Sequence, residues 1–325
     1  MTAPTHRTGY VHDAFFYAAQ DDLVEWAAPF LREGLDAGEH AVVVCEEPMA
    51  QALLEAVGDE RVLTLPREQI YQRVPVAITS YQKLMTDGPV ADGRRVRLLG
   101  DVDFGPTRET QQAWAGFESV VNRYLAPYDL WATCLYNTRR LSAAAIVDGI
   151  MTHPHVRDRG GRRINDDYVE PAEFLRSLGS TIPTSLTRLA SFRLDRKSEL
   201  SGMRAAVDRV LAENGTHADA RASCLVTVGE LTANSFLHGV PPVEVDVSRA
   251  DEHQLVIEVT DHGIGFDDPF FGYVVGSPEG LPTEGRGLWM VRHMCSSIEA
   301  AHLAGGFRVR AAFDERQPRF RDLLA

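Results

Sequence analysis

Three short polar segments in the second half of the chain constrain its fold more than any other feature of the sequence. They cover residues 230–238, 261–265 and 285–288 and read ELTANSFLH, DHGIG and GRGL. Each joins acidic, amide or glycine residues to an apolar run with the periodicity of a helix or a strand. We therefore expect a helix face, a strand end and a helix start to meet around one site.

The first segment lies within a helix predicted over 218–239. Spacings of four residues place Glu230, Asn234 and His238 along one face of that helix. Asn234 offers a neutral oxygen suited to Mg²⁺, which prefers oxygen ligands and usually shares its coordination with substrate phosphates. Glu230, one turn earlier, is placed to orient or deprotonate a nucleophile near that metal. His238 has two interpretations: a group of the site, or a side chain that satisfies the helix end by a hydrogen bond.

The second segment follows the apolar run LVIEVT, which predicts a strand over 254–261. A carboxylate at this strand end, Asp261, can accept a hydrogen bond from an adenine amino group. Gly263 and Gly265 allow the backbone to turn tightly and to approach a ligand without a Cβ atom in the way.

The third segment is a glycine pair, Gly285 and Gly287, at the start of an apolar helix predicted over 287–297. Free N–H groups at a helix N-terminus bind phosphate oxygens, aided by the helix dipole. The sequence contains no GxxxxGK[ST] pattern, so a P-loop is not the source of nucleotide binding.

Helices and antiparallel strands are predicted around these segments, an order that indicates an α/β sandwich with a single sheet. The expected strands cover 186–194, 243–248, 254–261, 298–303 and 306–313, and the expected helices cover 201–214, 218–239 and 287–297.

In order and spacing, the three segments resemble the N, G1 and G2 boxes of the GHKL (Bergerat) ATPase fold. The resemblance implies ATP and Mg²⁺ as cofactors, and it also implies the roles of individual residues. Glu230 matches the catalytic base, Asn234 the Mg²⁺ ligand, Asp261 the adenine reader, Gly263 and Gly265 the G1 turn, and Gly285 and Gly287 the phosphate-binding turn.

Within that superfamily, residues 183–325 are similar to the anti-sigma-factor serine kinases of the RsbW/SpoIIAB type. The segment between the second and third motifs is short, as in that group, and Arg204 matches the group's partner-contact arginine. The resemblance implies a serine/threonine kinase that sequesters an alternative sigma factor and phosphorylates a STAS-domain anti-anti-sigma factor. A homodimer is a further implication, although the preceding domain can replace or occlude that contact.

Two other functions remain open at this point. One is a binding module that holds ATP and captures a protein without kinase activity. The other is a sensor histidine kinase output domain, which normally follows a long helical hairpin with a phosphoacceptor histidine. Residues 179–200 are too short and too rich in proline signals for such a hairpin.

Strand and helix signals alternate through the first half of the chain, which indicates a mostly parallel sheet with helices on both faces. The charged stretch over 155–171 is expected to form a loop, and the boundary between two domains is placed after residue 182. The expected strands cover 40–45, 62–65, 96–100 and 130–136, and the expected helices cover 21–34, 49–56, 74–85, 111–125, 142–151 and 173–178.

Residues 1–182 resemble the MEDS sensory domain, in the segments FFY (15–17), PFLREGL (29–35) and GEHAVVVCEE (38–47), and again from the His-Pro pair at 153. The same similarity continues at Asn165, Tyr168, Pro171, Phe174 and Leu175. The resemblance implies a RecA/KaiC-like α/β/α core that has lost its P-loop. The loop YAAQDD before the first helix has no glycine or lysine, so we expect no tight triphosphate binding there.

A small-molecule signal is a further expectation for this domain. Cys45, Cys134, Tyr136 and His153 lie near predicted strand ends, where they could line a sensory pocket. The alternative, which we prefer, is that both cysteines are small core residues on buried strands.

The charge of the chain limits the classes of partner. The net charge is −13, which argues against direct nucleic-acid binding and against an anionic membrane surface. It is compatible with a partner that has basic surfaces, such as a sigma factor.

The four cysteines include no CxxC pair, so neither a metal knuckle nor a disulfide framework is expected. A reducing cytoplasm suits them, and the start MTAPTHRTGY lacks the apolar region of a signal peptide. We therefore expect a cytoplasmic protein.

Overall fold

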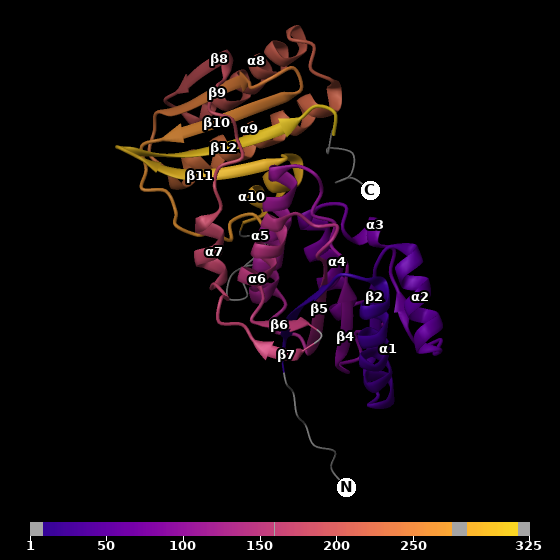
Figure 1. Cartoon of the computed structure of the whole chain (residues 1–325). Coiled ribbons are helices and arrows are strands. Elements are labelled where there is room, and N and C mark those ends of the chain that lie inside the picture. Colours follow the sequence, from indigo (N-terminus) through magenta and orange to yellow (C-terminus); the bar gives the residue numbers. More distant parts are fainter. Residues whose placement is uncertain (1–8, 159, 275–284, 318–325) are drawn as a thin grey trace. The chain divides into compact units, whose positions relative to one another are not determined.

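The computed structural model describes residues 9–158, 160–274 and 285–317, and the chain divides into two compact units, Met1–Leu178 and Gly179–Ala325 (Figure 1). The division falls before the boundary expected after residue 182, because residues 180–183 bond to the second unit. Ser180 Oγ donates to Glu299 Oε1 at 2.7 Å. Ile182, which is 3% exposed, packs with Val256 and Ala312 of the second unit.

The first unit is built on a seven-stranded sheet in the order β3-β2-β4-β5-β1-β6-β7. Neighbouring strands run parallel except β6 and β7, which run antiparallel. The strands are β1 (Val11–Tyr17), β2 (His40–Val44), β3 (Leu63–Thr64), β4 (Val96–Gly100), β5 (Leu130–Asn137), β6 (His155–Asp158) and β7 (Gly161–Ile164). The helices are α1 (Gln20–Asp36), α2 (Glu47–Val57), α3 (Arg67–Ile70), α4 (Val74–Thr86), α5 (Arg108–Tyr124), α6 (Ala143–Thr152) and α7 (Pro171–Ser177).

Helices cover both faces of this sheet. On one face Leu99 of β4 packs in a cluster with Leu23 of α1 and Leu53 of α2. On the other face its neighbour Leu98 lines a small cavity with Tyr81 of α4 and Phe117 of α5. This arrangement confirms the predicted α/β architecture with a mostly parallel sheet.

Two parts of the first sheet differ from the sequence prediction. The strand β1 was not predicted, and the expectation of a loop is wrong for residues 155–158 and 161–164, which form β6 and β7. Both departures involve the fully buried Asp13, whose carboxylate accepts from Trp131 Nε1 at 3.0 Å and from Arg162 Nε at 2.7 Å. Because paired charged residues occupy buried positions in these strands, their sequences lack the apolar pattern from which a strand is predicted.

The second unit has a five-stranded antiparallel sheet in the order β11-β12-β10-β9-β8 (Figure 1). Its strands are β8 (Thr187–Leu194), β9 (Val243–Arg249), β10 (Gln254–Asp261), β11 (Ser297–Leu303) and β12 (Gly306–Asp314). Its helices are η1 (Lys197–Glu199), α8 (Leu200–Glu213), α9 (Ala218–His238) and α10 (Arg286–Met294).

The three α-helices share one face of this sheet. Val207 of α8, Val228 of α9 and Val291 of α10 are fully buried in one cluster with Ile257 of β10. The next residue of that strand, Val256, points to the opposite face, as strand alternation requires. The expected α/β sandwich with a single sheet is confirmed.

In the part of the chain that the structure describes, no helix is both long and apolar enough to span a membrane. Residues 1–8, on which most of the signal-peptide argument rests, lie outside the described residues. Residues 275–284, in the segment between the second and third motifs, also lie outside them.

Candidate functional site

Helix α9 positions the two polar residues at the centre of the candidate site. Its buried face, which includes Cys224, Val228 and Leu231, packs into the core of the second unit. Glu230 and Asn234 are half-buried and lie one turn apart, so both emerge along the rim of that buried face.

The start of α10 lies directly against these two side chains. A Cβ atom added at Gly287 would lie 2.6 Å from Glu230 Oε2 and 3.6 Å from Asn234 Nδ2. Gly285, the N-cap of α10, has a left-handed backbone with φ +77°, a conformation that side-chain-bearing residues rarely adopt. The structure thus brings together Glu230, Asn234 and the glycine pair, which the sequence places far apart.

Asp261 ends β10 and is 6% exposed. Its Oδ1 atom accepts a hydrogen bond from the Gly263 N–H at 2.7 Å, which fixes the carboxylate at the turn. A Cβ atom at Gly239, just after α9, would overlap this carboxylate. The His262 N–H donates to the carbonyl of Val240 at 2.9 Å, so the turn after β10 is tied to the end of α9.

Gly265 has φ +63°, and a Cβ atom there would overlap the ring of Phe307 at the start of β12. The next residue, Phe266, packs on Phe307 at 4.9 Å and on Phe271 at 5.2 Å between ring centres. The DxGxG turn therefore packs against a cluster of phenylalanine rings.

Sequence reasoning missed the segment that follows this turn. Arg292 of α10 donates from Nε and a terminal nitrogen to the carbonyl of Phe271 at 3.2 and 3.0 Å, and its guanidinium lies 3.8 Å from the ring centre of Tyr273. A Cβ atom at Gly272, at φ +73°, would lie 2.7 Å from Leu288 O. The only sequence signals for the packing of this segment against α10 are Gly272 and Arg292 themselves.

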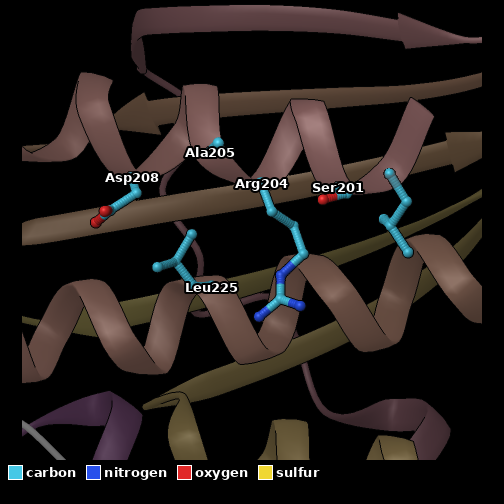
Figure 2. Close-up of a pocket in the computed structure, with 6 residues that line it drawn as sticks. Ser201, Arg204, Ala205, Asp208 and Leu225 are labelled. Carbon is cyan, nitrogen blue, oxygen red and sulfur yellow. The ribbon is translucent and has the colours of Figure 1, made fainter. Parts of the chain in front are cut away.

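Arg204 and His238 lie apart from these contacts. Arg204 extends from α8 across α9, where its Nε is 3.5 Å from the position of a Cβ atom at Gly229 (Figure 2). It lines a groove of about 350 Å³ together with Leu200, Asp208 and Leu225. His238 is the exposed last residue of α9, and its side chain makes no hydrogen bond or ion pair with the other described residues.

The arrangement fits a nucleotide held with Mg²⁺. Because Gly287 has no side chain, the start of α10 approaches Glu230 and Asn234 more closely than a residue with a Cβ atom could. The backbone start of α10 therefore lies beside both polar side chains, and helix N-termini bind phosphate. The Asn234 oxygen type suits Mg²⁺, and the Asp261 carboxylate suits an amino-group donor.

Two family models match the chain, one in each unit. Residues 11–154 match the MEDS domain, described as the methanogen/methylotroph DcmR sensory domain. Residues 194–313 match the histidine kinase-like ATPase domain.

Individual relatives match over shorter parts. The signal transduction histidine-protein kinase AfsQ2 of Streptomyces coelicolor is 36% identical over 101 residues. The match covers 29% of this chain and 18% of that protein. A crystal structure of the RsbU and RsbW domains of Rv1364c from Mycobacterium tuberculosis is 20% identical, covers 41% of this chain and 32% of its own, and gives a TM-score of 0.30. The chain thus spans about a fifth to a third of the length of these two proteins.

The family matches agree with the fold of each unit and with both resemblances seen in the sequence. The chain carries a MEDS domain followed by a histidine kinase-like ATPase domain.

Proposed function

We propose that this protein is an ATP-dependent serine/threonine kinase that acts as an anti-sigma factor. It holds an alternative sigma factor and phosphorylates a STAS-domain anti-anti-sigma factor, and its MEDS domain adjusts this balance in response to a small molecule. The observation that carries the proposal is the close approach of the α10 start to Glu230 and Asn234.

The chemistry follows from the side chains around that approach. Asp261 accepts a hydrogen bond from the adenine amino group, and the backbone at Gly285 and Gly287 binds phosphate oxygens. Asn234 supplies an oxygen ligand to Mg²⁺, which offsets phosphate charge when it is bound. Glu230 would accept the proton of the attacking hydroxyl as the terminal phosphoryl group passes to that oxygen, its bond to the β-phosphate breaks and ADP leaves.

The groove beside Arg204 supports a protein partner for the same domain. Arg204 is exposed and has no recorded ion pair among the described residues, whereas Asp208 on the same helix pairs with Arg221 at 2.9 Å. The apolar residues Leu200 and Leu225 line the same groove as Arg204. Such a combination of a free cation and apolar surface suits a partner helix with an acidic residue.

Two alternatives share the nucleotide site and differ in the chemistry. The first is an ATP-dependent binding module without kinase activity. The second is a histidine kinase output domain, which the likeness to AfsQ2 favours. Against it, the described residues 179–186 contain no helix, and the strand β8 begins directly afterwards.

Capture from the native cytoplasm tests the partners. We expect the tagged full chain to retain a sigma factor with ATP·Mg²⁺, and a STAS-domain protein to displace it. The Arg204→Ala variant should lose both partners and keep ATP binding. Failure to retain any sigma factor or STAS-domain protein, with or without ATP, would contradict the anti-sigma role.

The nucleotide site has its own test. Asn234→Ala removes the metal ligand without filling the site, so binding of a fluorescent ATP analogue should be lost while the circular dichroism spectrum is retained. Normal binding by this variant would show that the site is assigned to the wrong residues.

The proposed partners place the protein in the cytoplasm, without direct contact to nucleic acid or membrane. A homodimer through the ATPase domain is also part of the proposal.

A further inference from the structure

Four buried side chains that can bind metals converge inside the MEDS domain. They come from four separate elements: His12 from β1, Glu118 from α5, Cys134 from β5, and His153 from the end of α6. Their residues are 2%, 0%, 7% and 0% exposed. The strands explain part of the meeting: β1 and β5 are parallel neighbours with Ala14 opposite Cys134, so His12 and Cys134 point to the same face of the sheet.

Four of the six distances between these ligand atoms match the edges of a tetrahedral metal site. Cys134 Sγ lies 3.3 Å from His12 Nε2 and 3.2 Å from Glu118 Oε2. Glu118 Oε2 lies 3.3 Å from His12 Nε2 and 3.6 Å from His153 Nε2. Metal–ligand bonds of about 2.0–2.3 Å place tetrahedral ligands roughly 3.3–3.7 Å apart. One ligand atom from each residue lies within 4.8 Å of all the others.

The hydrogen bonds of His12 fix which ring nitrogen faces the cluster. Its Nδ1 contacts the side-chain oxygen of Asn122 at 3.0 Å. That amide is oriented by its own nitrogen, which donates to the backbone oxygens of Glu118 and Thr152 at 3.0 and 2.8 Å. The Asn122 oxygen can only accept, so the Nδ1 atom of His12 carries the hydrogen and its Nε2 presents a lone pair when the ring is neutral.

His153 is held in the same way. Its Nδ1 donates to the carbonyl of Gly149 at 2.8 Å, which leaves the Nε2 lone pair for the cluster. That Nε2 atom and Glu118 Oε1 are buried and have no hydrogen-bond partner among the described protein atoms. Metal-binding histidines typically donate their second ring nitrogen to an oxygen in this manner.

We propose that His12, Glu118, Cys134 and His153 bind one divalent transition-metal ion, for which Zn²⁺ is the best match. Two neutral imidazoles, a thiolate and a carboxylate carry a charge of −2 between them, which a divalent cation neutralises in this buried place. Imidazole and thiolate ligands select zinc and its neighbours over Mg²⁺ or Ca²⁺, and four ligands in tetrahedral array suit the d¹⁰ ion. When the ion binds, the Cys134 S–H bond breaks, its proton leaves to solvent, and a metal–sulfur bond forms.

This site differs from the metal site that the cysteine spacing argues against. A zinc knuckle uses CxxC pairs within one loop, whereas these ligands come from strands and helices far apart in the sequence. Sequence reasoning named Cys134 and His153 as possible pocket residues and preferred a core role for the cysteine. It also named Cys45, which belongs to a different cluster with Leu53 and Leu99 on the opposite face of the sheet.

Metal analysis of the full chain tests the proposal. The untagged protein is treated with a chelator, loaded with Zn²⁺, separated from free metal by gel filtration and measured by mass spectrometry. We expect about one zinc ion per chain and a higher midpoint of thermal unfolding with zinc than without it. Retention of less than about a tenth of an ion would overturn the proposal.

Replacement of zinc by Co²⁺ identifies the ligands. Cobalt bound to a thiolate gives a sulfur-to-metal charge-transfer band in the near ultraviolet, which we expect in the wild-type protein. Cys134→Ser should lose the band, whereas Cys45→Ser, Cys224→Ser and Cys295→Ser, each at a buried cysteine outside the cluster, should keep it. Loss of the band in any of those three controls, or its survival in Cys134→Ser, would contradict the assignment.

If Cys134→Ser fails to fold, the three cysteine controls still identify the ligand. When the charge-transfer band survives in Cys45→Ser, Cys224→Ser and Cys295→Ser, Cys134 is the remaining cysteine that can give rise to it. Glu118→Gln, which preserves side-chain shape, should weaken zinc binding at least about tenfold. Asn234→Ala should bind zinc normally, since it belongs to the other domain.

Discussion

Gly287→Ala perturbs the proposed nucleotide site at its closest contact. The new Cβ atom lies 2.6 Å from Glu230 Oε2, and restoring an ordinary contact of 3.4 Å requires the carboxylate to move by about 0.8 Å. The distance to Asn234 Nδ2, 3.6 Å, is already an ordinary contact. The substitution should therefore displace the proton acceptor and leave the metal ligand in place.

A displacement of this size at a reacting group can cost on the order of 100-fold in rate. We expect phosphate transfer to fall by about that factor, and affinity for ATP to fall by less than about tenfold, or about 1.4 kcal/mol. Stability should stay the same or rise by up to about 1 kcal/mol, since alanine favours helix over glycine.

The assay combines titration with a fluorescent ATP analogue, transfer of labelled phosphate to a captured STAS-domain protein, and chemical denaturation. Gly202→Ala is the matched control for binding and stability, because it lies in α8 with no atom within 4 Å of the added Cβ. It should gain about 0.5–1 kcal/mol and bind ATP normally. Wild-type transfer by Gly287→Ala would refute the placement of Glu230 at the reacting centre.

Two further predictions concern stability and thiol reactivity. Gly265→Ala should lower the free energy of unfolding of the ATPase domain by about 2–4 kcal/mol in chemical denaturation, because the backbone there is left-handed and the new Cβ atom would overlap the Phe307 ring. A loss below about 0.5 kcal/mol would show that the turn after β10 relaxes freely. Burial raises the pKa of the Cys45 and Cys224 thiols, so thiolate is scarce at pH 8 and both should react with Ellman's reagent far more slowly in the native protein than in denaturant; reaction at equal rates would show that these core regions open readily.

The sequence predicts most of the fold where apolar periodicity is undisturbed. The strand β4 and the strand β10 are found at the predicted bounds, 96–100 and 254–261. The strands β1, β6 and β7 were not predicted, because polar residues in them are paired across the sheet, as the contact between Asp13 and Arg162 shows. Such a partner lies far away in the sequence and cannot be read from local pattern.

The same limit applies to the two candidate sites. Helical spacing predicts that Glu230 and Asn234 share a face, because both lie on one helix. Two other features depend on how separate elements pack: the contact of Gly287 with Glu230 and the close approach of Gly265 to the ring of Phe307. The cluster in the MEDS domain depends on packing altogether, since its nearest ligands in the chain, Glu118 and Cys134, lie on different elements.

Phosphate transfer by the wild-type protein and Glu230→Gln tests the central claim most directly. Both are incubated with terminally labelled ATP, Mg²⁺ and the STAS-domain proteins of the same organism, and the labelled amino acid is identified. Glutamine preserves the shape of the side chain but cannot accept the hydroxyl proton. We predict acid-stable phosphoserine or phosphothreonine on one STAS-domain protein with the wild type, and transfer reduced at least about 100-fold by Glu230→Gln with ATP binding retained. Equal transfer by the two proteins, no transfer by the wild type, or acid-labile phosphohistidine on this chain would contradict the account.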